Sequence, residues 1–219
     1  MSDHSDAGAE ASKLWLIDAG YLFNAQRSVD PGYSFDYLKL RRKLEEHGAF
    51  WRAYYLNSTS HVPSEAQEKF HSWLGVAPPR GPQLITKLYE LKQVRSESAY
   101  CYECQTRVSL SCPNSEGHHL ENQQQKGVDV GIATLALAHR DRYDTLMLSS
   151  GDGDLMDAVE FLSERGKRIE LAVFSEGVSI DLQARADRVF WIDDFADEVR
   201  RGRPDSAPRF ENRRPSRAS

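Results

Sequence analysis

Strand-like and helix-like runs alternate along most of the chain, and this order constrains the fold more than any other feature. Short runs suited to strands are expected at 13–18, 50–56, 84–94, 146–149, 169–174 and 189–192. Helical apolar spacing falls between them, at 35–47, 63–74, 128–139, 155–164 and 179–186. This alternation is typical of an α/β protein, in which helices cover both faces of a mainly parallel central sheet.

The 219 residues are enough for one large domain with a small insertion. We expect that domain at 13–195, with a Cys/His-rich insertion at 96–125, and disordered ends at 1–12 and 196–219. The formal net charge is −5. Seven Arg and two acids give 200–219 a charge of +5, which leaves −10 for the rest of the chain. An Arg- and Pro-rich segment with almost no aliphatic residues is expected to stay unfolded.

The composition excludes several classes of protein. With 40% hydrophobic and 28% charged residues, the chain resembles ordinary soluble proteins rather than fibrous or wholly disordered ones. The longest apolar run, 130–138, is about half of what a spanning helix needs, so we expect no contact with membranes. The N-terminus lacks a signal-peptide pattern, and three cysteines do not make a secreted disulfide framework. We therefore expect a cytoplasmic protein.

Acidic residues follow the two most apolar strands. Asp18 ends the first, Asp152 and Asp154 follow the run at 146–149, and Asp129 opens the helix at 128–139. If those two strands are neighbours, the carboxylates converge at one sheet edge and need a cation to neutralise them. Oxygen-only ligands suit Mg²⁺ or Mn²⁺, which support phosphodiester cleavage with one or two ions. The alternative is that some of these residues only cap helices.

Three segments, at 15–24, 126–130 and 143–155, resemble the signature segments of the NYN domain family of PIN-like nucleases, including its LabA-like or DUF88 branch. They read WLIDAGYLFN, KGVDV and YDTLMLSSGDGDL, in the family order. The resemblance implies a Rossmann-like three-layer PIN/NYN fold and an endoribonuclease (a hydrolase) that cleaves RNA with Mg²⁺ or Mn²⁺. It also implies that the metal-binding and catalytic residues are Asp18, Asp129, Asp152 and Asp154.

The matched segments also suggest substrate contacts. Lys126 and Ser150 lie inside the motifs and are expected to contact phosphate. Relatives often have Asn where this chain has Tyr21, and Asn24 is the nearest substitute. Many LabA-like members have an acid where this chain has Leu135. These two differences favour an alternative, a catalytically weak or inactive RNA-binding or regulatory module in an RNA-processing or defence complex.

The insertion carries a second potential metal site. Cys101, Cys104 and Cys112, followed by His118, offer a Cys₃His set of the kind that holds structural zinc, with His119 as the alternative fourth ligand. A segment with so little apolar content needs such support to fold. The competing interpretation is a flexible loop with reduced cysteines.

The expected partner is single-stranded RNA, although the body is acidic. Local positive charge for RNA comes from Lys87, Lys92, Arg95 and Lys126, and from the Arg-rich tail. The sequence leaves open a homo-oligomer or a larger protein complex, and it does not identify the RNA.

Overall fold

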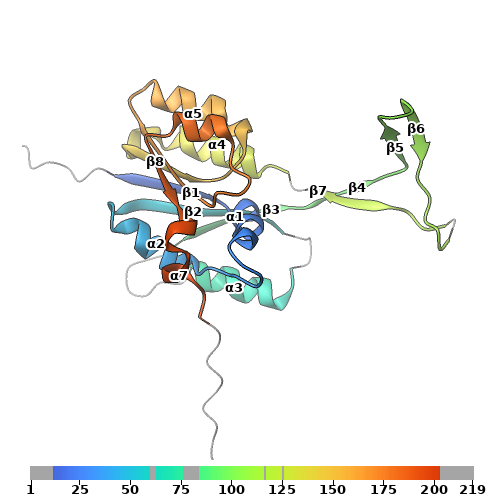
Figure 1. Ribbon diagram of the computed structural model, residues 1–219, viewed down its shortest axis with the longest axis horizontal. Coiled ribbons are helices and arrows are strands. Elements are labelled where there is room, and N and C mark those ends of the chain that lie inside the picture. The colour runs from blue at the N-terminus through green and yellow to red at the C-terminus, as the bar shows by residue number, and fades with distance from the viewer. Residues whose placement is uncertain (1–11, 60–62, 76–83, 116, 125, 203–219) are drawn as a thin grey trace, which may run out of the picture.

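The computed structural model describes residues 12–59, 63–75, 84–115, 117–124 and 126–202, and its centre is a six-stranded parallel sheet (Figure 1). The strands are β1 (Lys13–Asp18), β2 (Phe50–Thr59), β3 (Ile85–Glu90), β8 (Thr145–Ser149), β9 (Arg168–Val173) and β10 (Arg188–Trp191). Their spatial order is β10-β9-β8-β1-β2-β3. The predicted α/β class is confirmed, and β1 does pair with β8, the fourth of the predicted strands.

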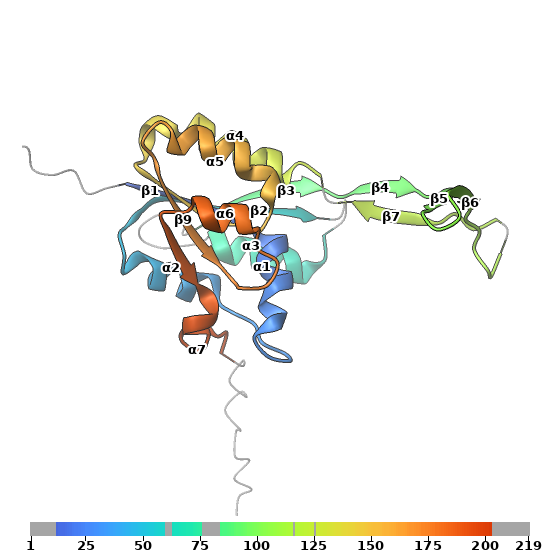
Figure 2. The same cartoon turned by 45° about the horizontal axis from the view of Figure 1, so that its top comes forward.

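Helices cover both faces of this sheet and make the three layers (Figures 1 and 2). Among the described helices, those on one face are α1 (Ala19–Ala25), α2 (Tyr37–Glu45), α3 (Glu65–Gly75) and α7 (Ala196–Val199). Those on the other face are α4 (Val128–Ala138), α5 (Met156–Ser163) and α6 (Ile180–Arg185). Short 3₁₀ turns follow as η1 (Gln26–Ser28), η2 (Arg140–Arg142), η3 (Gly153–Leu155) and η4 (Ile192–Phe195).

The apolar pattern of β1 explains why both faces are covered. Trp15 and Ile17 point into the core beneath α1 and α2, whereas Leu14 and Leu16 point into the core beneath α4 and α5. Successive strand residues face opposite sides, so a strand that is apolar throughout needs helices on both sides. All six residues of β1 are buried as a result.

The insertion forms a projecting arm, which we define as residues 92–124. Its strands are β4 (Lys92–Arg95), β5 (Ser98–Cys101), β6 (Thr106–Ser109) and β7 (Glu121–Gln124). β4 pairs with β7 and β5 pairs with β6, both antiparallel. Figures 1 and 2 show the arm leading away from the end of β3. Two predictions need correction, because the expected strand at 84–94 divides at Leu91 between two sheets, and the insertion begins before residue 96.

The end of the described chain also differs from the prediction. Residues 196–202, expected to belong to a disordered tail, contain α7 and a bridge between Phe35 and Arg200. Ala196 and Val199 are buried in the core beside α2, and this apolar contact stabilises the last turn. The predicted disorder of 1–11 and 203–219 lies outside the described residues.

A buried ion pair connects β1 to β9 across β8. Lys13 Nζ lies 2.7 Å from Glu170 Oε2, and the two side chains are only 6% and 3% exposed. Each charge depends on the other, because an unpaired charge at this depth is strongly unfavourable. In the described part of the chain, no helix is both long and apolar enough to cross a membrane.

Candidate functional site

The order of the strands defines where a ligand can bind. Numbered along the chain, the six strands are arranged 3-2-1-4-5-6, so the order reverses between β1 and β8. Open parallel sheets bind ligands in the crevice beyond the carboxyl ends of the strands at such a reversal. Asp18 is the last residue of β1, and the loop with Asp152 and Asp154 follows β8. The predicted acids therefore lie at the expected place in the fold.

Asp18 is held in position by the start of α1. It is the N-cap residue, and its Oδ1 accepts a hydrogen bond from the Tyr21 backbone N–H at 3.1 Å. Burial raises the pKa of Asp18, and the carboxylates of Asp129 and Asp152 raise it further, against the lowering by the Tyr21 N–H. Capping occupies one carboxylate oxygen and leaves the other available for a ligand. The capping interpretation and the site interpretation are compatible here.

The loop after β8 is fixed by its own hydrogen bonds. The fully buried Ser150 hydroxyl accepts from the Asp152 N–H at 3.2 Å, and Asp152 Oδ1 accepts from the Asp154 N–H at 2.9 Å. Asp152 therefore caps η3, while Asp154 is exposed beside it. Ser150 therefore helps to hold this loop, and its predicted contact with phosphate stays a prediction.

Gly151 is required by a close approach between two loops. A Cβ added at Gly151 would lie 2.1 Å from the carbonyl oxygen of Gly177 and 2.7 Å from Tyr21 Cε2. The Ser179 N–H donates to the Gly151 carbonyl at 2.9 Å, which holds the β9–α6 loop against the acidic loop. The glycine between Ser150 and Asp152 thus allows the backbone contact that positions the acids.

Asp129 approaches the same edge from α4. It lies in the first turn of that helix, after Gly127, whose φ of 87° is in the left-handed region. Burial raises the pKa of Asp129, and the carboxylates of Asp152 and Asp154 raise it further. Helix N-termini favour negative charge, which partly offsets this repulsion.

The four predicted acids therefore form one electrostatic cluster, which we call the acid cluster: Asp18, Asp129, Asp152 and Asp154. Their mutual repulsion and their oxygen-only chemistry fit a hard divalent cation. Within the described ranges, however, no three His, Cys, Asp or Glu side chains are already arranged to hold a metal ion. The acid cluster therefore provides suitable oxygen donors, but these are not yet arranged around a metal ion.

The remaining sequence-predicted positions have distinct surroundings. Lys126 is exposed immediately before α4. The Tyr21 hydroxyl donates to the Phe174 carbonyl at 2.8 Å, so this residue connects α1 to the end of β9. Leu135 is buried in the core between α4 and the sheet, where an ionised acid would be unfavourable.

A pocket of about 270 Å³ lies beside the acid cluster and was not predicted from the sequence. We call it the α1 pocket, and the residues that matter here are Phe23, Asn24, Tyr37, Tyr55, Asn57 and Phe70. Ala19 and Gly20, which follow Asp18 directly, also line it, as does Arg201. One signal in the sequence could have indicated this pocket, because the polar Asn57 comes directly after the predicted strand at 50–56.

The cysteines and histidine of the arm are arranged in two pairs. Cys104 Sγ lies 2.9 Å from Thr106 Oγ1. Its hydrogen bonds with Thr106 and with Cys101 lower the pKa of the Cys104 thiol. Cys112 Sγ lies 3.5 Å from His118 Nδ1. For the part of the arm that the structure describes, these pairs are not gathered into one metal-binding group. The predicted zinc site stays a prediction.

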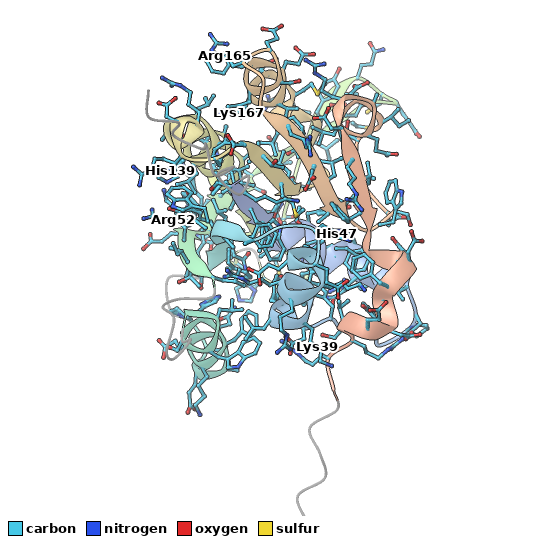
Figure 3. All side chains as sticks on the ribbon, turned by 90° about the vertical axis from the view of Figure 1, so that its left-hand side faces the viewer. Lys39, His47, Arg52, His139, Arg165 and Lys167 are labelled. Carbon is cyan, nitrogen blue, oxygen red and sulfur yellow. The ribbon has the colours of Figure 1, made fainter. Side chains whose placement is uncertain are left out.

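Figure 3 views the molecule from the side on which the strands of the sheet begin. Arg52 and His139 are labelled close together in that view. His139 Nε2 lies 3.1 Å from the Tyr54 hydroxyl. Burial lowers the pKa of His139, and the nearby charges of Arg52, Arg142 and Lys87 lower it further. His139 therefore lies within a small group of positive charges at this end of the sheet.

Comparisons with known proteins give a similar fold and a family for this chain. The fold is similar to the crystal structure of a protein of unknown function from Vibrio parahaemolyticus, with a TM-score of 0.61 and 19% identity. That similarity covers 90% of this chain and 100% of the other. No curated protein matches the sequence. The NYN domain pattern matches residues 14–193, which include all six sheet strands and the acid cluster. The chain therefore belongs to the NYN domain family, within the PIN-like nuclease superfamily.

Proposed function

We propose that the protein is an endoribonuclease that hydrolyses RNA phosphodiester bonds with Mg²⁺ or Mn²⁺ bound at the acid cluster. The observation that carries the proposal is the convergence of carboxylates from β1, α4 and the β8 loop at the reversal of strand order. Membership of a nuclease family supports the same reaction class. As the substrate we propose single-stranded RNA, and the exposed position of Asp154 leaves the acid cluster open to it.

The residues of the chain have separate roles in this proposal. Asp18, Asp129, Asp152 and Asp154 hold the cation, which when bound neutralises phosphate charge and makes water a better nucleophile. Lys126 and the N-terminus of α4 attract the phosphate, because both carry positive charge beside the cluster. The contact between Gly151 and Gly177 keeps the β8 loop in place while the acids repel one another.

Purified protein and labelled single-stranded RNA test this proposal directly. Cleavage is expected with Mn²⁺ or Mg²⁺, and not with EDTA. Asp152→Asn should be inactive, while Asp157→Asn is the matched control, because Asp157 is an exposed acid on the first turn of α5. Cleavage that persists in EDTA or in Asp152→Asn would contradict the metal mechanism.

A second candidate function is an RNA-binding or regulatory module with little or no catalysis. It is favoured by Leu135, which is buried and apolar where many LabA-like members have an acid, and by Tyr21, which stands where relatives often have Asn. RNA binding without cleavage, under every metal condition in the same assay, would support this module over the nuclease.

We also propose that zinc bound by Cys101, Cys104, Cys112 and His118 stabilises the distal arm. The two pairs described above support it, because each brings two potential zinc ligands together in a segment whose strands are largely exposed. This role is structural and independent of the reaction at the acid cluster.

A further inference from the structure

We infer that the α1 pocket binds one unpaired base of the RNA substrate, beside the phosphate that the acid cluster would cleave. The inference rests on the proposed function for the identity of the substrate, but it concerns a different set of side chains. It assigns to this chain a base-binding subsite on the β2 side of Asp18.

The position of the pocket links it to the acid cluster. Ala19 and Gly20 line it and follow Asp18 in the chain, so the pocket starts one residue from the acid. Electrostatics agree, because the Asp18 carboxylate contributes to the raised pKa values of Tyr37 and Tyr55, after the larger effect of burial. A nucleotide whose phosphate lies at Asp18 could therefore place its own base, or that of its neighbour, in this pocket.

The size and the walls of the pocket suit a flat aromatic ligand. Its volume of about 270 Å³ is just below the range of about 300–1,000 Å³ typical for drug-sized ligands. Phe23, Tyr55 and Phe70 contribute aromatic rings to it, and Phe23 is 56% exposed. Exposed aromatic rings that bases stack on are the common means of binding single-stranded RNA.

Polar groups in the pocket can recognise the edge of a base. Tyr37 is only 7% exposed and lines the pocket, so its hydroxyl can meet a base that enters. The Tyr55 hydroxyl accepts from Asn57 Nδ2 at 3.0 Å, so its own proton is left to donate. The Asn57 Oδ1 accepts from the Ser58 N–H at 2.8 Å, which fixes this amide in place. Asn24 adds an exposed amide from α1.

A cation completes the pocket. The Arg201 guanidinium lies 5.6 Å from the centre of the Phe70 ring, and the Arg201 backbone N–H donates to the Ser34 carbonyl at 2.8 Å. Its positive charge can contact the phosphate of the bound nucleotide or stack on the base. Aromatic walls, hydrogen-bonding groups at the base edge and an arginine together match a nucleotide better than a purely apolar ligand.

Fluorescence anisotropy with a labelled six-nucleotide single-stranded RNA tests the inference. The titration is run in EDTA, so that it reports binding without any cleavage. Phe23→Ala is the main variant, and Tyr37→Phe removes only a hydroxyl. Tyr102→Ala is the matched control, because Tyr102 is an 85% exposed aromatic residue on the arm. Thermal unfolding of each variant shows that it is folded.

We expect Phe23→Ala to weaken RNA binding about 5- to 100-fold, the range for loss of one stacked base. Tyr37→Phe should weaken it about 2- to 10-fold, as for one hydrogen bond. Tyr102→Ala should bind like wild type, and a fully paired duplex should bind less tightly because its bases are not free to enter. Equal affinity of Phe23→Ala and wild type, equal losses in Phe23→Ala and Tyr102→Ala, or no RNA binding by wild type would each overturn the inference.

A parallel NMR titration with AMP, CMP, GMP and UMP distinguishes a base within RNA from a free nucleotide. Weak mononucleotide binding that moves the signals of the pocket, together with tighter RNA binding sensitive to Phe23→Ala, supports the subsite. Tight mononucleotide binding with RNA binding insensitive to Phe23→Ala would overturn it in favour of a nucleotide site. Both titrations are carried out without metal and measure binding alone. If the RNA cleavage assay is negative, they still show whether the α1 pocket binds a base.

Discussion

Gly151→Ala tests whether the close contact between the two loops positions the acidic loop. The added Cβ would lie 2.1 Å from the Gly177 carbonyl oxygen, whereas ordinary contacts begin near 3.4 Å. The obstacle is backbone, and it cannot move aside as a flexible side chain would. The β9–α6 loop must therefore shift by about 1.3 Å, the difference between those two distances, and the hydrogen bond from Ser179 to Gly151 is lost or weakened.

The expected cost follows from these two effects. Overpacking of this kind costs about 1–3 kcal/mol, and the lost hydrogen bond about 0.5–1.5 kcal/mol more. We therefore expect a loss of about 2–4 kcal/mol in the free energy of unfolding. For a chain of this length, that corresponds to a fall in Tm of about 4–16 °C. Displacement of Asp152 by about 1 Å should also reduce the cleavage rate, by up to about 100-fold.

Thermal unfolding followed by circular dichroism measures the stability effect, and the RNA assay measures the catalytic one. Gly153→Ala is the control in the same loop, because its Cβ would meet only the Ser179 side chain, at 3.4 Å or more. It should change the free energy of unfolding by less than about 1 kcal/mol. A Gly151→Ala protein with the Tm and activity of wild type would refute the reasoning.

Three further predictions concern other parts of the molecule. Lys13→Met leaves Glu170 buried without its partner and should lower the free energy of unfolding, measured by urea denaturation, by about 3–5 kcal/mol. The double variant Lys13→Met/Glu170→Leu should recover most of this loss. A loss below about 1 kcal/mol in Lys13→Met would contradict the prediction. Because the pKa of His139 is lowered in the fold, the unfolded chain binds the proton more readily, so stability falls as pH drops below 6.5. His139→Gln should reduce that fall between pH 7.5 and 5, and an unchanged profile argues against it. Metal analysis should find about one zinc per chain in wild type and none in Cys104→Ser, whereas zinc-free wild type purified without chelator counts against the zinc site.

The sheet and most helices could be predicted because their apolar patterns are strong and local. The strand at 13–18 and the helix at 128–139 are examples, since each is apolar enough to require burial. α1 and α7 were missed because both are short and depend on tertiary packing, through residues such as Leu22 and Val199. The division at Leu91 was missed because β3 and β4 continue one alternating pattern while their pairing partners change.

The acids of the site could be predicted, whereas the sequence held only one hint of the pocket beside them, the polar Asn57 after the strand at 50–56. Asp18 and Asp152 end or follow strands whose adjacency is a property of this class of sheet, so their convergence follows from the element order. The α1 pocket combines α1, β2, α3 and Arg201, which are far apart in the sequence. No local pattern reports which of these side chains share a cavity, because that depends on how the helices pack on the sheet.

Direct measurement of Mn²⁺ binding tests the central claim, that the acid cluster is a cation site. Isothermal titration of metal-free wild type with Mn²⁺ should give saturable binding of one or two ions. Asp152→Asn should lose that binding by at least about 10- to 100-fold, since even loss of an outer residue at a metal site has that effect. Asp157→Asn should bind like wild type. Equal Mn²⁺ affinity in wild type and Asp152→Asn, or no binding by wild type, would contradict the account.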